Sequence, residues 1–207
     1  MRILLFTVLG CVALGGAATP GSCGLMLNEI VADPARDWDG DGTYNYRDDE
    51  WIEVYNPGPG SLHLAGYLIG DADRAPIYGF SGDLTGGGHR VVYGSEAVAY
   101  QQAHGIGAYG LRLGNDGGTV TLLQVVGADT LLTDSYTFNT YEAEDDRSTG
   151  RYLDGSASWR IFDQYNPYTG QTPPSGTGLE PTPGGANGGA PVPTVRTTWG
   201  GIRGLYR

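Results

Sequence analysis

The stretch EWIEVYN (Glu50–Asn56) decides the class of fold. In an extended chain the side chains of this stretch alternate between two sides. One side carries the mixed set Trp51, Glu53 and Tyr55, and the other carries the apolar pair Ile52 and Val54. An alternation of this kind is typical of a β-strand that lies with one face on a hydrophobic core. The stretch therefore predicts a strand that is buried on one side.

Further stretches of the chain have the same character. They are short, apolar or alternating, and bounded by turn residues: LMLNEIV (Leu25–Val31), LHLAGYLI (Leu62–Ile69), RVVYG (Arg90–Gly94), GLRL (Gly110–Leu113), TVTLLQVV (Thr119–Val126) and DTLLTDSYTF (Asp129–Phe138). GNDGG (Gly114–Gly118) predicts a hairpin-type turn between two of them. One helix is expected over Gly94–Gly105, with Ser95 as its cap and Gly105 at its end. Short strands at this spacing predict an all-β sandwich or barrel.

Composition narrows the class of protein. The chain has 207 residues and a formal net charge of −11, and its 12 basic residues are all arginine. This length suits one domain with flanking segments. An acidic surface repels phosphate backbones, so we expect no nucleic-acid partner.

The start of the chain, MRILLFTVLGCVALGGAATPG, has the layout of a secretory signal peptide. Arg2 precedes an apolar run over Ile3–Leu14, and small residues follow. We expect residues 1–18 to be removed by cleavage after Ala18, and the protein to be secreted and extracellular or at the cell surface. The run is too short for a permanent transmembrane helix, and no other stretch is long enough.

The two cysteines fall on either side of the expected cleavage point. Cys11 would be lost with the signal peptide, so Cys23 would remain alone without an internal disulfide. Anchoring as a lipoprotein through Cys23 is an alternative to a free thiol or a mixed disulfide. Against it, Pro20 stands where a lipobox requires an apolar residue.

A set of motifs in a fixed order resembles the lamin tail domain, in its secreted bacterial form. The motifs are LNEIVADP, DEWIEVYNPG, LHLAGYLIGD, FSGDLTGGGHRVVYG, LRLGNDGGTVTLL, TDSYTF, DRSTGRYLDGSASW and PTPGGAN. The resemblance covers residues 25–187 and leaves a tail over residues 188–207. It implies an immunoglobulin-like β-sandwich without catalytic residues, which acts as a binding or structural module outside the cell.

The acidic stretch DWDGDGTYNYRDDEW (Asp37–Trp51) fits a twelve-residue calcium-loop template. The predicted ligands, in chain order, are Asp37, Asp39, Asp41, the Thr43 carbonyl, Asn45 and Asp48, with Gly42 at the sharp turn. A hard cation takes six to eight oxygens, and alternate residues of a tight loop can direct theirs to one centre. Strands flank the loop, so we expect a free calcium loop rather than an EF-hand. Asp49 and Glu50 are assigned to the next strand, and an acidic loop without an ion is the alternative.

Other polar residues predict structural roles. The cluster EAEDDR (Glu142–Arg147) lacks alternation and predicts a solvated loop. Glu29 and Glu53 lie in the resemblance motifs, where pairing with arginine is one expectation. The histidines have no metal-ligand spacing, and no nucleophile elbow is present. We therefore predict no catalytic residues.

Three functions remain open. The first is a non-enzymatic, calcium-stabilised module that binds an unknown protein or glycan at the cell surface. The second is an accessory or catalytic component of a secreted hydrolase, and the third is a carbohydrate-binding module with coplanar exposed aromatic rings. The final segment TTWGGIRGLYR (residues 197–207) is either a docking or sorting peptide or a disordered end.

Overall fold

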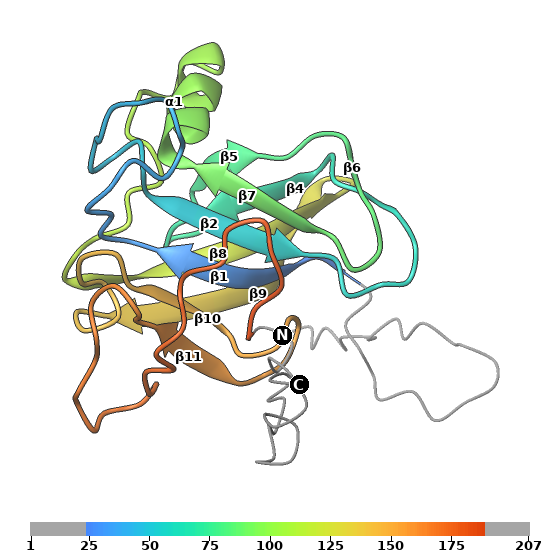
Figure 1. Ribbon diagram of the computed structural model, residues 1–207. Coiled ribbons are helices and arrows are strands. Elements are labelled where there is room, and N and C mark those ends of the chain that lie inside the picture. Colours follow the sequence, from blue (N-terminus) through green and yellow to red (C-terminus); the bar gives the residue numbers. More distant parts are fainter. Residues whose placement is uncertain (1–23, 189–207) are drawn as a thin grey trace, which may run out of the picture.

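The computed structural model describes residues 24–188. The predictions for the signal peptide, Cys23 and the final segment lie outside these residues. The described chain forms open antiparallel sheets with one short helix (Figure 1), which confirms the predicted all-β sandwich. Within residues 24–188, no helix has the length and apolar character that crossing a membrane would need.

Two main sheets make up the sandwich. One has five strands in the order β11-β10-β1-β2-β7: β1 (Met26–Val31), β2 (Trp51–Tyr55), β7 (His89–Tyr93), β10 (Ser148–Arg151) and β11 (Trp159–Phe162). The other has four strands in the order β5-β4-β8-β9: β4 (Tyr67–Gly70), β5 (Pro76–Gly79), β8 (Gly117–Val126) and β9 (Asp129–Asn139). A small pair joins β3 (Leu62–His63) to β6 (Asp83–Leu84).

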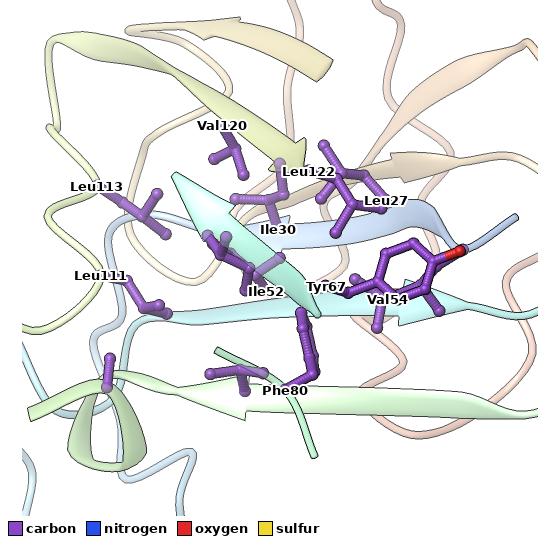
Figure 2. Packing of buried hydrophobic residues seen from close by; sticks show 14 of the residues in the cluster. Leu27, Ile30, Ile52, Val54, Tyr67, Phe80, Leu111, Leu113, Val120 and Leu122 are labelled. Atoms are coloured by element: carbon purple, nitrogen blue, oxygen red, sulfur yellow. The ribbon is translucent and has the colours of Figure 1, made fainter. Parts of the chain in front are cut away.

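One hydrophobic core lies between the two main sheets (Figure 2). Both sheets supply buried side chains to it, including Leu27, Ile30, Ile52, Val54, Tyr67, Ile69, Val120 and Leu122. Burial of one such aliphatic side chain contributes about 1.5–3 kcal/mol to folding. The apolar side of EWIEVYN therefore faces the core as the sequence predicts.

The other side of β2 is also covered, which corrects the prediction of a strand buried on one side. Trp51 is fully buried against Val31 and Val91. Glu53 is fully buried as well. The chain's last described segment crosses the outer face of β1 and β2, where Figure 1 shows it in red. The alternation in the sequence shows which residues of the strand are polar. It does not show that a segment later in the chain covers the polar face of the strand.

Two strand predictions need correction. LHLAGYLI forms two short strands, β3 and β4, because the chain turns at Gly66, whose φ of 94° is a left-handed conformation. GLRL is not a strand. Its two leucines are buried in the core, but Arg112 between them has a φ of 59°. GNDGG is consequently a turn that leads into β8 rather than a hairpin between two strands.

Four strands were not predicted from the sequence: β5, β6, β10 and β11. The most informative is β10, whose residues STGR are all buried although none is apolar. It lies between β1 and β11, so its backbone forms hydrogen bonds with a neighbouring strand on each side. A strand of this kind carries no hydrophobic pattern for sequence reasoning to find.

The predicted helix is present as α1 (Gly94–Ala103), and it ends before Gly105 as expected. Ser95 does not cap it. The helix begins after Tyr93, which makes no side-chain cap. Instead the N–H groups of Gly94 and Ser95 donate to the carbonyls of Glu50 (2.8 Å) and Asp48 (3.0 Å). The end of the acidic stretch therefore satisfies the free N–H groups at the start of α1.

Substitution of Gly94 by alanine should disturb this contact. A Cβ at this position would lie 1.9 Å from the Arg47 carbonyl oxygen, so the acidic stretch would have to move away from α1. We expect the G94A variant to lose about 1–3 kcal/mol of stability, measured by urea unfolding. Gly60→Ala is the matched control, because a Cβ there meets nothing within 4 Å. Equal stability of the two variants would contradict this account.

Candidate metal loop and buried carboxylate network

Three carboxylates of the acidic stretch come together. Asp37, Asp39 and Asp49 each offer an oxygen, and these oxygens lie within 4.8 Å of one another. Carboxylates this close repel each other unless a proton or a cation lies between them. The group therefore has the donor chemistry of a site for a hard divalent cation.

Backbone N–H groups hold these carboxylates in place. Asp37 accepts from Gly40 (2.8 Å) and Gly42 (2.9 Å), two glycines with left-handed φ values. The buried Asp49 lies at the centre of the loop. Its Oδ1 accepts from the N–H groups of Trp38 (2.6 Å) and Asp39 (3.0 Å), and its Oδ2 accepts from Asn45 (2.7 Å).

The remaining predicted ligands are arranged differently from the template. Asp48 forms an ion pair with Arg47 (2.6 Å) and accepts from the Asn45 side-chain amide (2.9 Å). Asp41 is exposed and accepts from the N–H of Thr43 (2.7 Å). The last carboxylate in the group is therefore Asp49 and not its neighbour Asp48. The template spacing predicted Asp48 as the last ligand of the loop. Nothing in the sequence showed that the side chain of Asp49 points into the loop instead.

The second acidic cluster is only in part the solvated loop that the sequence predicts, because Glu144 and Asp145 are exposed but its other charged residues are not. Glu142, Asp146 and Arg147 are buried. Asp146 accepts hydrogen bonds from the Trp38 indole (2.9 Å) and from the Arg36 side chain (3.0 Å). It thereby fixes the chain at the entrance to the acidic loop, a role that sequence reasoning missed.

Glu29 and Glu53 form the second cluster of carboxylates. They are paired neighbours on β1 and β2, and both are fully buried. Glu29 accepts from the Thr182 hydroxyl (2.8 Å) and backbone N–H (3.1 Å), and also from the Ser148 hydroxyl. Glu53 accepts from the Asn28 amide (2.8 Å) and from the N–H of Gly184 (2.7 Å). Neither glutamate pairs with an arginine, so the expectation of such pairs was wrong.

Two of these partners, Thr182 and Gly184, belong to residues 181–187, which we call the C-terminal strap. Asn187 completes its attachment: its side-chain amide donates to the carbonyls of Asn28 (3.2 Å) and Arg151 (3.0 Å). Its backbone N–H donates to Asp154 (2.9 Å), and the same carboxylate lies 3.1 Å from His89. The strap is thus bonded to the sheet at several separate points.

Burial changes the protonation of this network. Desolvation raises the pKa of Glu29 to about 8, although the hydrogen bond from Ser148 opposes the shift. Desolvation likewise raises the pKa of Glu53 to about 7, and Glu50 beside the acidic loop reaches about 8 for the same reason. Contact with Asp154 raises the pKa of His89. The folded protein therefore holds protons on buried glutamates near neutral pH.

The exposed aromatic residues do not gather on a sheet. The most exposed tyrosines of residues 24–188 lie outside the strands, and two of them share the acidic loop: Tyr44, Tyr46, Tyr109, Tyr152 and Tyr165. A carbohydrate-binding module would need several exposed rings aligned on one face. The position of these tyrosines gives that function no support.

Known proteins provide no assignment for either cluster. Comparison with models of protein families, with curated proteins and with solved structures found no match. We therefore infer the roles of the two carboxylate clusters from the contacts that their residues make. The acidic loop gathers oxygen donors around one point, and the network bonds the C-terminal strap to β1 and β2.

Proposed function

We propose that this protein is a secreted, non-enzymatic module of the lamin-tail type with an immunoglobulin-like sandwich. In this proposal a calcium ion in the acidic loop stabilises the domain, which binds a protein or glycan outside the cell. The observation that carries the proposal is the group formed by Asp37, Asp39 and Asp49, with oxygens within 4.8 Å of one another.

The buried network supports the family assignment. Four of the motifs that resemble the lamin tail domain meet in it: Glu29 comes from LNEIV, Glu53 from EWIEVYN, Arg151 from DRSTGRYL and Asn187 from PTPGGAN. These residues join segments up to 159 positions apart. Residues of these motifs therefore meet in one hydrogen-bonded network on the outer face of β1 and β2.

The same network supports a non-enzymatic role. Glu29 and Glu53 are a close pair of carboxylates with raised pKa values, which in an open site would suggest acid–base catalysis. Both are fully buried and bonded to the C-terminal strap. A substrate would have to displace the strap before it reached them.

Calcium fits the acidic loop by its donor set. Three carboxylates supply negative charge, and the carbonyl of Thr43 and the side chain of Asn45 are the further predicted donors. Backbone N–H groups already orient Asp37 and Asp49, so binding need not order the loop from a disordered state. A bound ion would remove the repulsion between the carboxylates and so favour the folded state.

Calcium should therefore raise the thermal stability of the protein. We expect binding with a dissociation constant on the order of 10⁻⁴–10⁻³ M, as in other extracellular modules. At about 100 times that constant the stabilisation would be about 2.7 kcal/mol. Calorimetric titration measures the affinity, and thermal unfolding with and without a chelator measures the stabilisation. The absence of any binding heat at millimolar calcium would overturn the proposal.

Two variants distinguish the structural group from the linear template. Asp39→Asn keeps the oxygen that accepts from the N–H of Asp41 and removes one charge from the group, so it should weaken calcium binding at least tenfold. Asp48→Asn removes a charge that is already paired with Arg47, so it should weaken binding much less. Asp39 is a ligand in both arrangements, so a loss in D48N as large as that in D39N would return Asp48 to the site in place of Asp49.

A further inference from the structure

A cleft that belongs to neither cluster opens beside α1. Its volume is about 180 Å³. Three segments line it: Asp71, Pro76 and Ile77 come from β5 and the turn before it, Gln101 comes from α1, and Ile106, Tyr109 and Arg112 come from the chain after α1. A cavity of about 150 Å³ is enough to hold benzene, so this cleft has room for a single ring. A separate, smaller cavity is lined by core residues such as Ile52 and Leu113 and has Asp71, Ile77 and Arg112 in common with the cleft.

The backbone of Arg112 is held in an unfavourable conformation at the edge of this cleft. Its φ of 59° is left-handed, which costs energy for a residue with a side chain. Leu111 and Leu113 on either side are buried in the core, as Figure 2 shows. The backbone of Arg112 and Leu113 lies close enough to the Glu50 carboxylate to offset part of the rise in its pKa. These contacts fix the position from which the Arg112 side chain extends before any ligand arrives.

The cleft presents one charge of each sign. Within residues 24–188 the Arg112 guanidinium makes no ion pair, and it lies 5.5 Å from the centre of the Tyr109 ring. The carboxylate of Asp71 uses Oδ1 to accept from the N–H groups of Asp73 and Ala75, both at 3.0 Å. Its Oδ2 accepts no hydrogen bond from the described residues. A simple anion would be repelled by Asp71, and a simple cation by Arg112.

We propose that this cleft binds a small zwitterion of the α-amino-acid class with an apolar side chain. The carboxylate of the ligand pairs with Arg112, and its ammonium group pairs with Asp71. The apolar side chain lies against Ile77, Ile106 and Tyr109. A molecule that carries both charges together with an apolar group matches all of these surfaces.

Three probes of the same ring size test the charge requirement. Phenylalanine carries both charges, 3-phenylpropanoate lacks the ammonium group, and phenethylamine lacks the carboxylate. Titrations followed by ¹H–¹⁵N NMR should show saturable shifts at cleft residues, with phenylalanine bound at least tenfold more tightly than either of the others. No saturable shift with phenylalanine overturns the proposal, and equal affinity for 3-phenylpropanoate overturns the zwitterion assignment.

Arg112→Gly separates binding from folding. Glycine accepts the left-handed conformation without strain, so the melting temperature should not fall, while the affinity for phenylalanine should fall at least tenfold. Arg74→Gly is the matched control. Arg74 also has a left-handed φ, of 62°, but it does not line the cleft, so this variant should bind as the unmodified protein does. Unchanged phenylalanine binding in R112G would overturn the proposal.

Asp71→Asn tests the ammonium partner. Asparagine keeps the Oδ1 acceptor on which the N–H groups of Asp73 and Ala75 depend, so the turn should persist. The loss of charge should bring the affinities for phenylalanine and 3-phenylpropanoate together. A preference for phenylalanine that survives in D71N would contradict the assignment of Asp71.

Discussion

The free energy of unfolding should fall by about 6 kcal/mol as the pH rises from about 5 to about 8, because the folded protein holds protons on buried glutamates. The folded-state pKa is about 8 for Glu29 and about 7 for Glu53, against 4.5 for an unperturbed side chain. Between these values the folded state binds more protons than the unfolded chain. The stabilisation is complete below the unfolded pKa and is lost as the pH rises through the folded values.

The two glutamates should titrate as a coupled pair. They are direct neighbours on β1 and β2, so ionisation of one opposes ionisation of the other. Hydrogen bonds from Thr182 and Gly184 stabilise the charged forms and offset part of the desolvation cost. Glu50, whose pKa is also about 8, adds to the fall in stability in the same direction.

Urea unfolding at several pH values, with a chelator present to remove calcium, measures this dependence. Glu29→Gln keeps a neutral side chain of the same shape, so it should lie near the unmodified protein at pH 5 and lose less stability by pH 8. Glu180→Gln is the control, because Glu180 is exposed. A stability that is flat or rising over this range would show that the glutamates are ionised in the folded protein.

Replacement of Arg151 by alanine should cost about 3–5 kcal/mol, because Arg151 is buried and its loss leaves the Asp134 carboxylate, only 15% exposed, without its charged partner. Arg151 is buried on β10, where its Nε donates to the carbonyl of Leu27 (2.7 Å). Its Nη2 donates to Asp134 of β9 (2.9 Å), and the Asp134 carboxylate also accepts from the N–H of Leu27 (3.0 Å). One side chain thus connects the five-stranded sheet to the four-stranded sheet.

A double-mutant cycle with Asp134→Asn tests that connection. The combined variant should be less destabilised than the sum of the single variants by at least about 1 kcal/mol, since removal of one partner already breaks the pair. Arg160→Ala on β11 is the control. Within residues 24–188 Arg160 forms no ion pair, and we expect a change within about 0.5 kcal/mol. Equal losses in R151A and R160A would contradict the role given to Arg151.

The sequence predicts the class of fold because β1, β2, β8 and β9 carry their own hydrophobic patterns. It does not predict β10, because Ser148, Thr149 and Arg151 are buried through contacts made by other segments. The covered outer face of β2 is missed for the same reason. The residues that cover Glu53 follow it by 131 positions, and nothing near EWIEVYN indicates their presence.

The acidic loop shows a similar limit. The sequence identifies where oxygen donors concentrate, since the spacing of Asp37 and Asp39 and the glycine after Asp41 are local features. The choice between Asp48 and Asp49 depends on tertiary contacts. Arg47 pairs with Asp48, while the carbonyl of Asp48 contacts the start of α1, and these contacts turn Asp49 toward the loop.

Thr182 bonds to Glu29 across 153 positions, and Asn187 bonds to Asn28 across 159. A ribosome therefore makes almost the whole domain before it makes the residues that seal the first two strands. Contacts at such separations slow the folding of a chain. In any state in which the strap is not bound, we expect the two glutamates to be exposed to water and ionised at neutral pH. Binding of the strap would then take up protons from the solvent, so we expect the rate of this step to depend on pH.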